Sequence, residues 1–187
     1  EHPGGARIDV LTLDLREKES NYEAAIVETI RSAEREVLIA TPYFLLPRPV
    51  RDALLDVADR GVDVRALTAG KIDVPWGRAA ARSQYERLLL GGLRLYEMWD
   101  QTLHAKFCSA DRARSVVGSY NVDLWGRHFN QEAGIAVWDE GLADGLAGSF
   151  FRGVEMGREV TLDEVRGWSA PLRLVHRLNY AAARAVT

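Results

Sequence analysis

The chain has 187 residues, of which 47% are hydrophobic and 27% charged, a composition typical of one globular domain. Its net charge of −3 counts against a nucleic-acid-binding protein, because such proteins usually present a basic surface. Cys108 is the single cysteine, so the chain cannot form an internal disulfide.

Apolar residues alternate or recur at helical spacing along the chain, and these patterns predict the elements in order. Strands are expected at residues 8–13, 36–42, 62–67, 93–96, 103–109, 115–119 and 133–138. Helices are expected at residues 21–35, 49–60, 78–90, 141–156 and 171–185, with a loop at 70–77. Strands that alternate with helices indicate an α/β fold, and the hairpin formed by the fifth and sixth strands makes the sheet mixed. We therefore expect a mixed β-sheet flanked by helices on both faces.

No internal repeat or low-complexity segment divides the sequence, so residues 1–187 are expected to form a single lobe. Its core is expected at about residues 15–165, followed by a C-terminal helix within 166–187. This last stretch has no acidic residue and four arginines, Arg166, Arg173, Arg177 and Arg184. A basic amphipathic helix can lie on anionic lipid, but packing against its own domain with the arginines in solvent explains the pattern equally well.

The segment with the most chemical content is His104-Ala-Lys106-Phe-Cys-Ser-Ala-Asp111. In an extended strand, alternation places His104 and Lys106 on the same face. That face would carry a nucleophile or base that works at neutral pH beside a fixed positive charge. Such a pair suits chemistry at a phosphate, where negative charge builds up in the transition state.

Three polar residues follow this segment, and each has a role in such a site. Ser119 and Asn121, fifteen and seventeen positions after His104, can donate hydrogen bonds to phosphate oxygens. Glu132, twenty-eight positions after His104, can hold one imidazole nitrogen and fix the tautomer of the ring. We predict that these residues and Lys106 converge in one pocket, with Glu132 about 3 Å from an imidazole nitrogen of His104.

This arrangement resembles the phospholipase D superfamily, in which an HKD motif is followed by GSxN and a later acidic residue. The resemblance runs from about Asn21 to about Trp168 and is strongest to the C-terminal half of bacterial cardiolipin synthases. The segments that carry this second resemblance are Thr41 to Pro47, Arg60 to Arg65, Asn121 to Asp123 and Asn130 to Glu132.

Two departures from the cardiolipin synthase pattern bear on the substrate and leave the superfamily resemblance intact. Trp125 and Gly126 stand where the NxDxRS motif has Arg and Ser. Arg112 stands where a Gly usually follows the aspartate of the motif.

The resemblance implies a two-step phosphodiester exchange that needs no metal and no cofactor. One histidine attacks phosphorus to form a phosphohistidine, and a second histidine protonates the leaving alcohol and then deprotonates the acceptor. The residues expected to be catalytic are His104, Lys106, Asp111 and Glu132, although a structural role in the turn suits Asp111 better. The residues expected to bind the substrate phosphate are Lys106, Ser119 and Asn121.

One His-x-Lys motif is half of such a site, and the sequence contains no other. The second half is expected from another lobe, either in the same longer chain or in a second copy around a two-fold axis. Because the sequence begins at Glu1 and not at a methionine, we expect the C-terminal half of a longer enzyme. The resemblance then implies a phosphatidyltransferase that acts on phosphatidylglycerol at the cytoplasmic side of a bacterial inner membrane.

Three alternatives stay open. A homodimeric endonuclease of the same superfamily is disfavoured by the acidic balance of the chain. A phospholipase D that hydrolyses phospholipids would differ only in taking water as the acceptor. A lobe without catalytic function, which completes the scaffold of another half, is disfavoured by the intact motif residues.

Aromatic residues and the other histidines supply further candidates. Tyr43 and Phe44 follow a strand end, where α/β folds place ligands, and core packing is equally expected for them. Trp76 is expected at the mouth of the pocket or at a lipid surface. His128 is expected in a loop, and His176 at the surface of the last helix.

Overall fold

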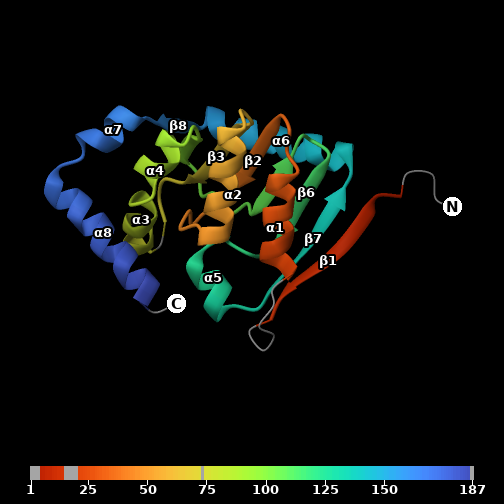
Figure 1. Ribbon diagram of the computed structural model, residues 1–187, viewed down its shortest axis with the longest axis horizontal. Coiled ribbons are helices and arrows are strands. Elements are labelled where there is room, and N and C mark those ends of the chain that lie inside the picture. Colours follow the sequence, from red (N-terminus) through yellow and green to blue (C-terminus); the bar gives the residue numbers. More distant parts are fainter. Residues whose placement is uncertain (1–4, 15–20, 73, 186–187) are drawn as a thin grey trace.

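The computed structural model describes residues 5–14, 21–72 and 74–185. These residues form an eight-stranded sheet with the strand order β1-β7-β6-β5-β2-β3-β4-β8 (Figure 1). The parallel strands at its centre are β2 (Glu36–Ala40), β3 (Asp63–Ala69) and β4 (Arg94–Met98). The antiparallel strands are β5 (Phe107–Ala110), β6 (Arg114–Gly118), β7 (Glu132–Trp138), β1 (Arg7–Leu13) and β8 (Gly157–Val160).

Helices cover both faces of this mixed sheet, as the sequence predicted. Their bounds are α1 (Asn21–Arg31), α2 (Arg48–Asp59), α3 (Pro75–Arg82), α4 (Tyr85–Leu90), α5 (Leu124–Phe129), α6 (Glu140–Glu155), α7 (Leu162–Gly167) and α8 (Ala170–Ala185). On one face, α1, α2 and α4 bury Ile26, Leu54 and Leu88 against alternate strand residues such as Ile39. On the other face, α6 buries Phe150 in a second cluster. The alternation of strand side chains thus supplies both halves of the core.

Several elements differ from the sequence prediction. The N-terminal strand pairs with β7 along its whole length, so the sheet begins well before the core limit expected at residue 15. The single helix expected at 78–90 is two helices, because the hydroxyl of Ser83 bonds back to the carbonyl of Ala80 and the chain turns there. The short elements α5, β8 and α7 were not predicted, and the motif strand begins at Phe107 rather than at residue 103.

The C-terminal helix packs against its own domain. Figure 1 shows α8 lying along α3 at the end of the molecule away from β1. Ala183 of α8 is buried in a small cluster with Ala80, Ala81 and Leu45. Among the described helices, none is both long and apolar enough to cross a lipid bilayer.

Candidate active site

The predicted site residues other than Asp111 come together at one end of the sheet, where β2 and β6 finish and β5 and β7 begin. The backbone N–H of Gly118 donates to the carbonyl of Lys106 over 3.3 Å, and the N–H of Ser119 donates to the carbonyl of Ala133 over 2.9 Å. These two bonds place Lys106, directly before β5, and Ser119, directly after β6, next to Glu132 at the start of β7. His104 precedes the first residue of β5 by three positions and reaches the same end of the sheet.

A close approach between strands fixes this end of the sheet. Gly118 and Gly134 stand opposite each other in the pairing of β6 with β7, with the ring of Tyr22 against them. A Cβ on Gly118 would lie 2.5 Å from the Cα of Gly134, and a Cβ on Gly134 would lie 2.5 Å from the Cζ of Tyr22. The glycine of the GSxN motif is therefore required by packing, and it sets the position of Ser119.

Lys106 supplies a half-buried positive charge to the site. Its Nζ donates to the carbonyl oxygen of His104 over 2.8 Å, so the ammonium lies against the backbone of the motif histidine. Burial lowers the pKa of Lys106 below its ordinary value of 10.5, while the nearby carboxylates of Glu132 and Asp123 act in the opposite direction. The site therefore combines one cation with two carboxylates.

Glu132 is held by Ser119 and not by His104. The Ser119 hydroxyl donates to Oε2 of Glu132, and the N–H of Ala133 donates to the same hydroxyl over 3.0 Å. The His104 ring is exposed and makes no hydrogen bond within the described part of the chain. The expected bond between Glu132 and an imidazole nitrogen of His104 is thus not formed in this structure, where the carboxylate orients the serine instead.

Asn121 is positioned by a strained turn. Its carbonyl accepts a hydrogen bond from the buried hydroxyl of Thr41, the residue that follows β2. The next residue, Val122, has a φ of 50°, a left-handed conformation that is rare for a β-branched side chain and is typical of sites under functional constraint. The side-chain oxygen of Asn121 is buried and has no hydrogen-bond partner within the described residues, so a bound donor would satisfy it.

Asp123 ends this turn and begins α5, a role that the sequence analysis did not assign. Its carboxylate accepts from the N–H groups of Trp125 and Gly126 over 2.8 and 2.6 Å. Burial raises the pKa of Asp123, and these two N–H donors partly offset that rise. The signal in the sequence was the aspartate itself, because Asp is among the residues most often found at the N-cap of a helix. Lysines or prolines at this position would leave the helix uncapped.

A cavity of about 250 Å³ opens beside the turn. It is lined by Tyr43, Leu45, Val74, Gly77, Asn121, Asp123, Trp125, Gly126 and Asn130. Trp76, 41% exposed, packs on Trp125 with the ring centroids 3.7 Å apart, in line with its expected place near the pocket. The two aromatic residues after β2 have different environments: Tyr43 lines the cavity, and Phe44 is buried in the core.

Asp111 lies at the opposite end of β5 from Lys106, which favours the structural role in the turn over the catalytic role also expected for it. β5 pairs antiparallel with β2, which places Asp111 beside the start of β2. Its carboxylate accepts from the backbone N–H groups of Glu34, Arg35 and Glu36 over 2.8, 2.9 and 2.8 Å. Although burial opposes the change, these donors lower the pKa of Asp111. Asp111 therefore ties the turn after β5 to the chain that enters β2.

The other histidines lie outside this group. His128 is exposed on α5, where a loop was expected. His176 is 4% exposed and packs edge-on against Trp168 with the ring centroids 4.8 Å apart, so the expectation of a surface position was wrong. Burial lowers the pKa of His176, and the positive charges of Arg82 and Arg78 act in the same direction. No group of three or more His, Cys, Asp or Glu side chains suited to a metal ion occurs among the described residues.

Known proteins with similar sequences are cardiolipin synthases. A sequence model of the family described as "Cardiolipin synthase, PLD-like domain" matches residues 26–152. The chain is 30% identical over 172 residues to cardiolipin synthase B of Salmonella typhi, and 31% identical over 145 residues to a cardiolipin synthase of Clostridium perfringens. These alignments cover 90% and 78% of this chain but 42% and 30% of the relatives. The chain thus spans less than half the length of the relatives it matches.

Solved structures share the fold at lower sequence identity. Phosphatidylserine synthase of Haemophilus influenzae superposes with a TM-score of 0.75 at 15% identity, over 100% of this chain and 48% of that one. Nuc, a phospholipase D family member from Salmonella typhimurium, superposes with a TM-score of 0.72 at 19% identity, over 84% of this chain and 99% of that one. Since the family model covers most of the described sheet, the chain belongs to the family of phospholipase D-like domains of cardiolipin synthase.

Proposed function

We propose that this chain is one catalytic half of a cardiolipin synthase-like phosphatidyltransferase that acts on phosphatidylglycerol. The observation that carries the proposal is the meeting of Lys106, Ser119 and Glu132 at the ends of adjacent strands, with His104 at the same end of the sheet. Membership of the cardiolipin synthase family supports the same chemistry.

The proposed reaction has two steps that use two histidines. In the first, one histidine attacks phosphorus, the bond to the leaving glycerol oxygen breaks, and the other histidine gives that oxygen a proton. In the second, the hydroxyl of a second phosphatidylglycerol gives its proton to that base and attacks phosphorus, which displaces the first histidine. His104 is one member of the pair, and the other belongs to a second lobe.

The remaining residues would stabilise charge on the phosphoryl group. Lys106 is half-buried, and a cation in a partly dry site stabilises nonbridging oxygens more strongly than one in water. Asn121 can donate its amide N–H to the same oxygens. Ser119 donates to Glu132 in the free protein, so phosphate binding by Ser119 would exchange this bond for one to the substrate.

A lipid substrate fits the surroundings of the site better than DNA does. The cavity next to Asn121 is walled by Tyr43, Leu45, Val74 and Trp125, which offer apolar surface to the glycerol backbone or an acyl chain. The chain is net acidic, which weakens its attraction to a polyanion. Because the proposed substrate is a phospholipid, we place the full-length protein at a membrane surface. The second lobe would come from the same chain or from a second copy.

The substrate is tested by supplying purified full-length protein with phosphatidylglycerol vesicles and, separately, with supercoiled plasmid. Cardiolipin and glycerol should form from the vesicles, and chelation of metal ions with EDTA should leave the rate unchanged. Phosphatidic acid without cardiolipin would assign hydrolysis instead. Nicked plasmid without any lipid product would assign an endonuclease and contradict the proposal.

A further inference from the structure

A second and larger cavity, of about 540 Å³, lies next to the first. Two chain segments contribute to both cavities. Leu45 lines the first cavity and Leu46 the second, while Leu124 lines the second cavity and its neighbours Asp123 and Trp125 line the first. The N–H of Leu124 donates to the carbonyl of Leu45 over 3.2 Å, which joins the two segments into one wall. The second cavity is therefore separate from the candidate active site but shares a wall with its pocket.

Arginine dominates the lining of this second cavity, here named the arginine pocket. Its charged residues among those described are one aspartate, Asp52, and six arginines, Arg48, Arg51, Arg87, Arg127, Arg177 and Arg184. They come from α2, α4, α5 and α8, so segments far apart in the sequence contribute to it. The whole chain has a net charge of −3, so the gathering of six arginines in one cavity does not follow from its overall composition.

Acidic groups balance only part of this charge. Asp52 pairs with Arg48 at 3.3 Å, Arg51 at 3.1 Å and Arg87 at 3.5 Å, so three guanidinium groups share one carboxylate. Arg127 pairs with Glu23 at 3.3 Å. Even with Arg184 left out of the count, five guanidinium groups stand against these two carboxylates among the described residues, and the pocket keeps a positive potential that favours an anion.

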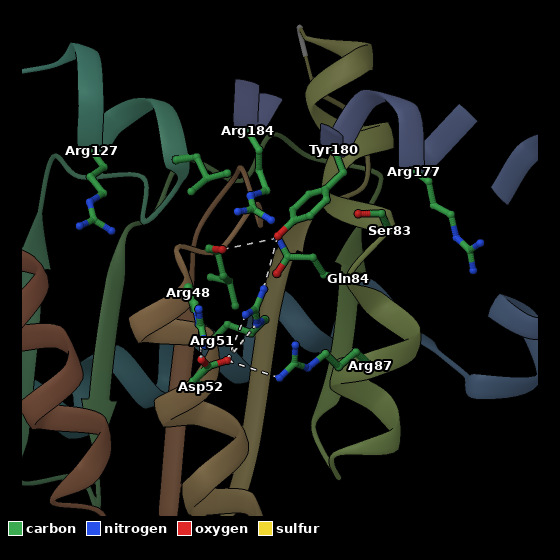
Figure 2. A pocket seen from close by; sticks show the side chains of 12 residues that line it. Arg48, Arg51, Asp52, Ser83, Gln84, Arg87, Arg127, Arg177, Tyr180 and Arg184 are labelled. Atoms are coloured by element: carbon green, nitrogen blue, oxygen red, sulfur yellow. Dashed lines mark hydrogen bonds and ion pairs between the residues drawn. The ribbon is translucent and has the colours of Figure 1, made fainter. Parts of the chain in front are cut away.

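The pocket contains a buried arginine whose guanidinium is held in place by contacts within the protein. Arg51 is 8% exposed, and its guanidinium is held between Asp52 and the hydroxyl of Tyr180, which lies 3.4 Å away on α8. Figure 2 shows Arg48, Arg51 and Arg87 gathered around Asp52, with Tyr180 and Arg184 of α8 reaching toward the same space. A guanidinium that is already oriented loses little freedom when it binds a ligand.

The start of α2 adds to the same potential. This helix of twelve residues begins at Arg48, and it has no acidic residue in its first turn and no side-chain cap. Arg48 at the start of α2 lines the pocket, so the positive end of the helix dipole lies at the pocket wall and favours a bound anion.

We propose that the arginine pocket binds a phosphate group, carried by an anionic phospholipid or by a soluble phosphate ester. Guanidinium groups recognise phosphate because their planar fork donates two parallel hydrogen bonds to two of its oxygens. A phospholipid held here by its phosphate would lie beside the candidate active site, where it could serve as a substrate of the proposed reaction. This role as a substrate rests on the proposed function, whereas phosphate binding does not.

The test measures binding in full-length protein that carries Lys106→Ala, which removes the cation of the candidate active site. One arm titrates inorganic phosphate and glycerol 3-phosphate by calorimetry at constant ionic strength. The other arm measures cosedimentation with vesicles of phosphatidylcholine alone and of phosphatidylcholine mixed equally with phosphatidylglycerol. Because neither arm needs turnover, its outcome is independent of whether the proposed function is correct.

The pocket variant is Arg48→Gln with Arg177→Gln, and the matched control is Arg94→Gln with Arg173→Gln. Each pair removes two exposed arginines, and Arg48 and Arg94 each lose an ion pair of 3.3 Å. Arg173 and Arg177 lie one turn apart on α8, but only Arg177 lines the pocket. Circular dichroism melting confirms that both variants fold.

We expect the pocket variant to weaken binding by about a hundredfold, tenfold for each arginine, and the control to change it by less than about twofold. Binding to soluble phosphates assigns a phosphate ester, and binding that needs phosphatidylglycerol vesicles assigns a lipid headgroup. An equal loss in both variants would mean unspecific attraction and overturn the proposal, as would the absence of binding in both arms.

Discussion

At the residue scale, the fold gives Lys106 and Asp111 different tasks although both belong to one short motif. Lys106 stands at the start of the strand among the candidate site residues, and Asp111 stands at its far end and binds only backbone N–H groups. Sequence spacing predicted that Lys106, Ser119 and Glu132 would meet, because they precede or follow strands that pair. It could not predict that Glu132 would accept from Ser119, because spacing alone does not decide whether a hydroxyl or an imidazole donates to a carboxylate.

The charge state of Lys106 leads to a prediction about pH. Because burial lowers its pKa below 10.5, the ammonium loses its proton at a lower pH than an exposed lysine does. We expect kcat/KM of the full-length protein to fall on the alkaline side before pH 10.5, and this fall to move to higher pH in Lys106→Arg, whose guanidinium stays charged. An alkaline limb at the same pH in both proteins would show that Lys106 does not control it.

Asp111 leads to a prediction about stability. Asp111→Ala should lower the free energy of unfolding by about 2 kcal/mol at neutral pH, because three backbone N–H groups lose a charged acceptor. Since the pKa of Asp111 is lower in the folded state, its contribution exists above the unfolded pKa and is lost as pH falls through the folded pKa. Urea unfolding at neutral pH and at about pH 3 should therefore show a smaller difference between the proteins in acid. Turnover by the folded variant should stay within a few fold of wild type, and a loss of several orders of magnitude would restore a catalytic role.

At the element scale, long periodic segments were predictable and short ones were not. Most strands, namely β1 to β4, β6 and β7, and the helices α2, α6 and α8 follow clear apolar patterns, and their centres were predicted correctly. The elements α5, β8 and α7 have four to six residues each, too few to show a period. The two helices are fixed by local caps, Asp123 for α5 and Thr161 for α7, and β8 is fixed by its pairing with the distant strand β4.

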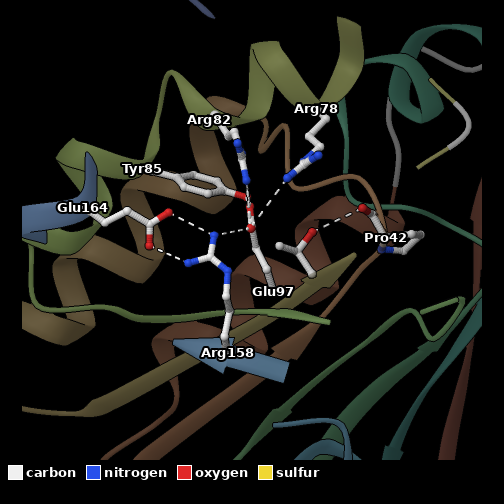
Figure 3. Close-up of polar contacts among 8 residues, drawn as sticks. Pro42, Arg78, Arg82, Tyr85, Glu97, Arg158 and Glu164 are labelled. Atoms are coloured by element: carbon white, nitrogen blue, oxygen red, sulfur yellow. Dashed lines mark hydrogen bonds and ion pairs between the residues drawn. The ribbon is translucent and has the colours of Figure 1, made fainter. Parts of the chain in front are cut away.

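One buried network holds α3, α4 and β8 onto the end of β4. Glu97 of β4 is fully buried and pairs with Arg82 at 2.8 Å, Arg158 at 3.2 Å and Arg78 at 3.8 Å (Figure 3). The hydroxyl of Tyr85 donates to the same carboxylate over 3.2 Å. Because α3 also carries Gly77 of the first cavity, this network helps to position the wall of the candidate site.

Removal of this carboxylate should be costly. Glu97→Ala leaves three arginines near one another without their central partner, and we expect a loss of about 3–5 kcal/mol in the free energy of unfolding. The matched control is Glu159→Ala, which breaks an exposed pair with Arg94 and should cost about 1 kcal/mol or less. Chemical denaturation of both variants measures the difference, and equal losses would contradict the structural role of Glu97.

At the scale of the whole molecule, the sheet gathers the candidate site residues at one end and the motif aspartate at the other. The chain carries one His-x-Lys motif and spans less than half of its curated relatives. The layer architecture and mixed sheet were predictable from alternation, but the place of α8 was not, because both a lipid surface and α3 suited its pattern. In the structure α8 packs on α3 and contributes to the arginine pocket.

The central claim is that His104 takes part in phosphodiester exchange at this end of the sheet. The most direct measurement is the rate of cardiolipin formation from phosphatidylglycerol vesicles by full-length wild type, His104→Ala and His128→Ala. His128 is a matched control because it is also an exposed histidine, on the nearby helix α5. We expect His104→Ala to lose several orders of magnitude in rate, since nucleophilic and acid–base catalysis both need His104 and its partner histidine from the second lobe, while His128→Ala stays within about twofold of wild type. Near-normal cardiolipin formation by a folded His104→Ala protein would contradict the central claim.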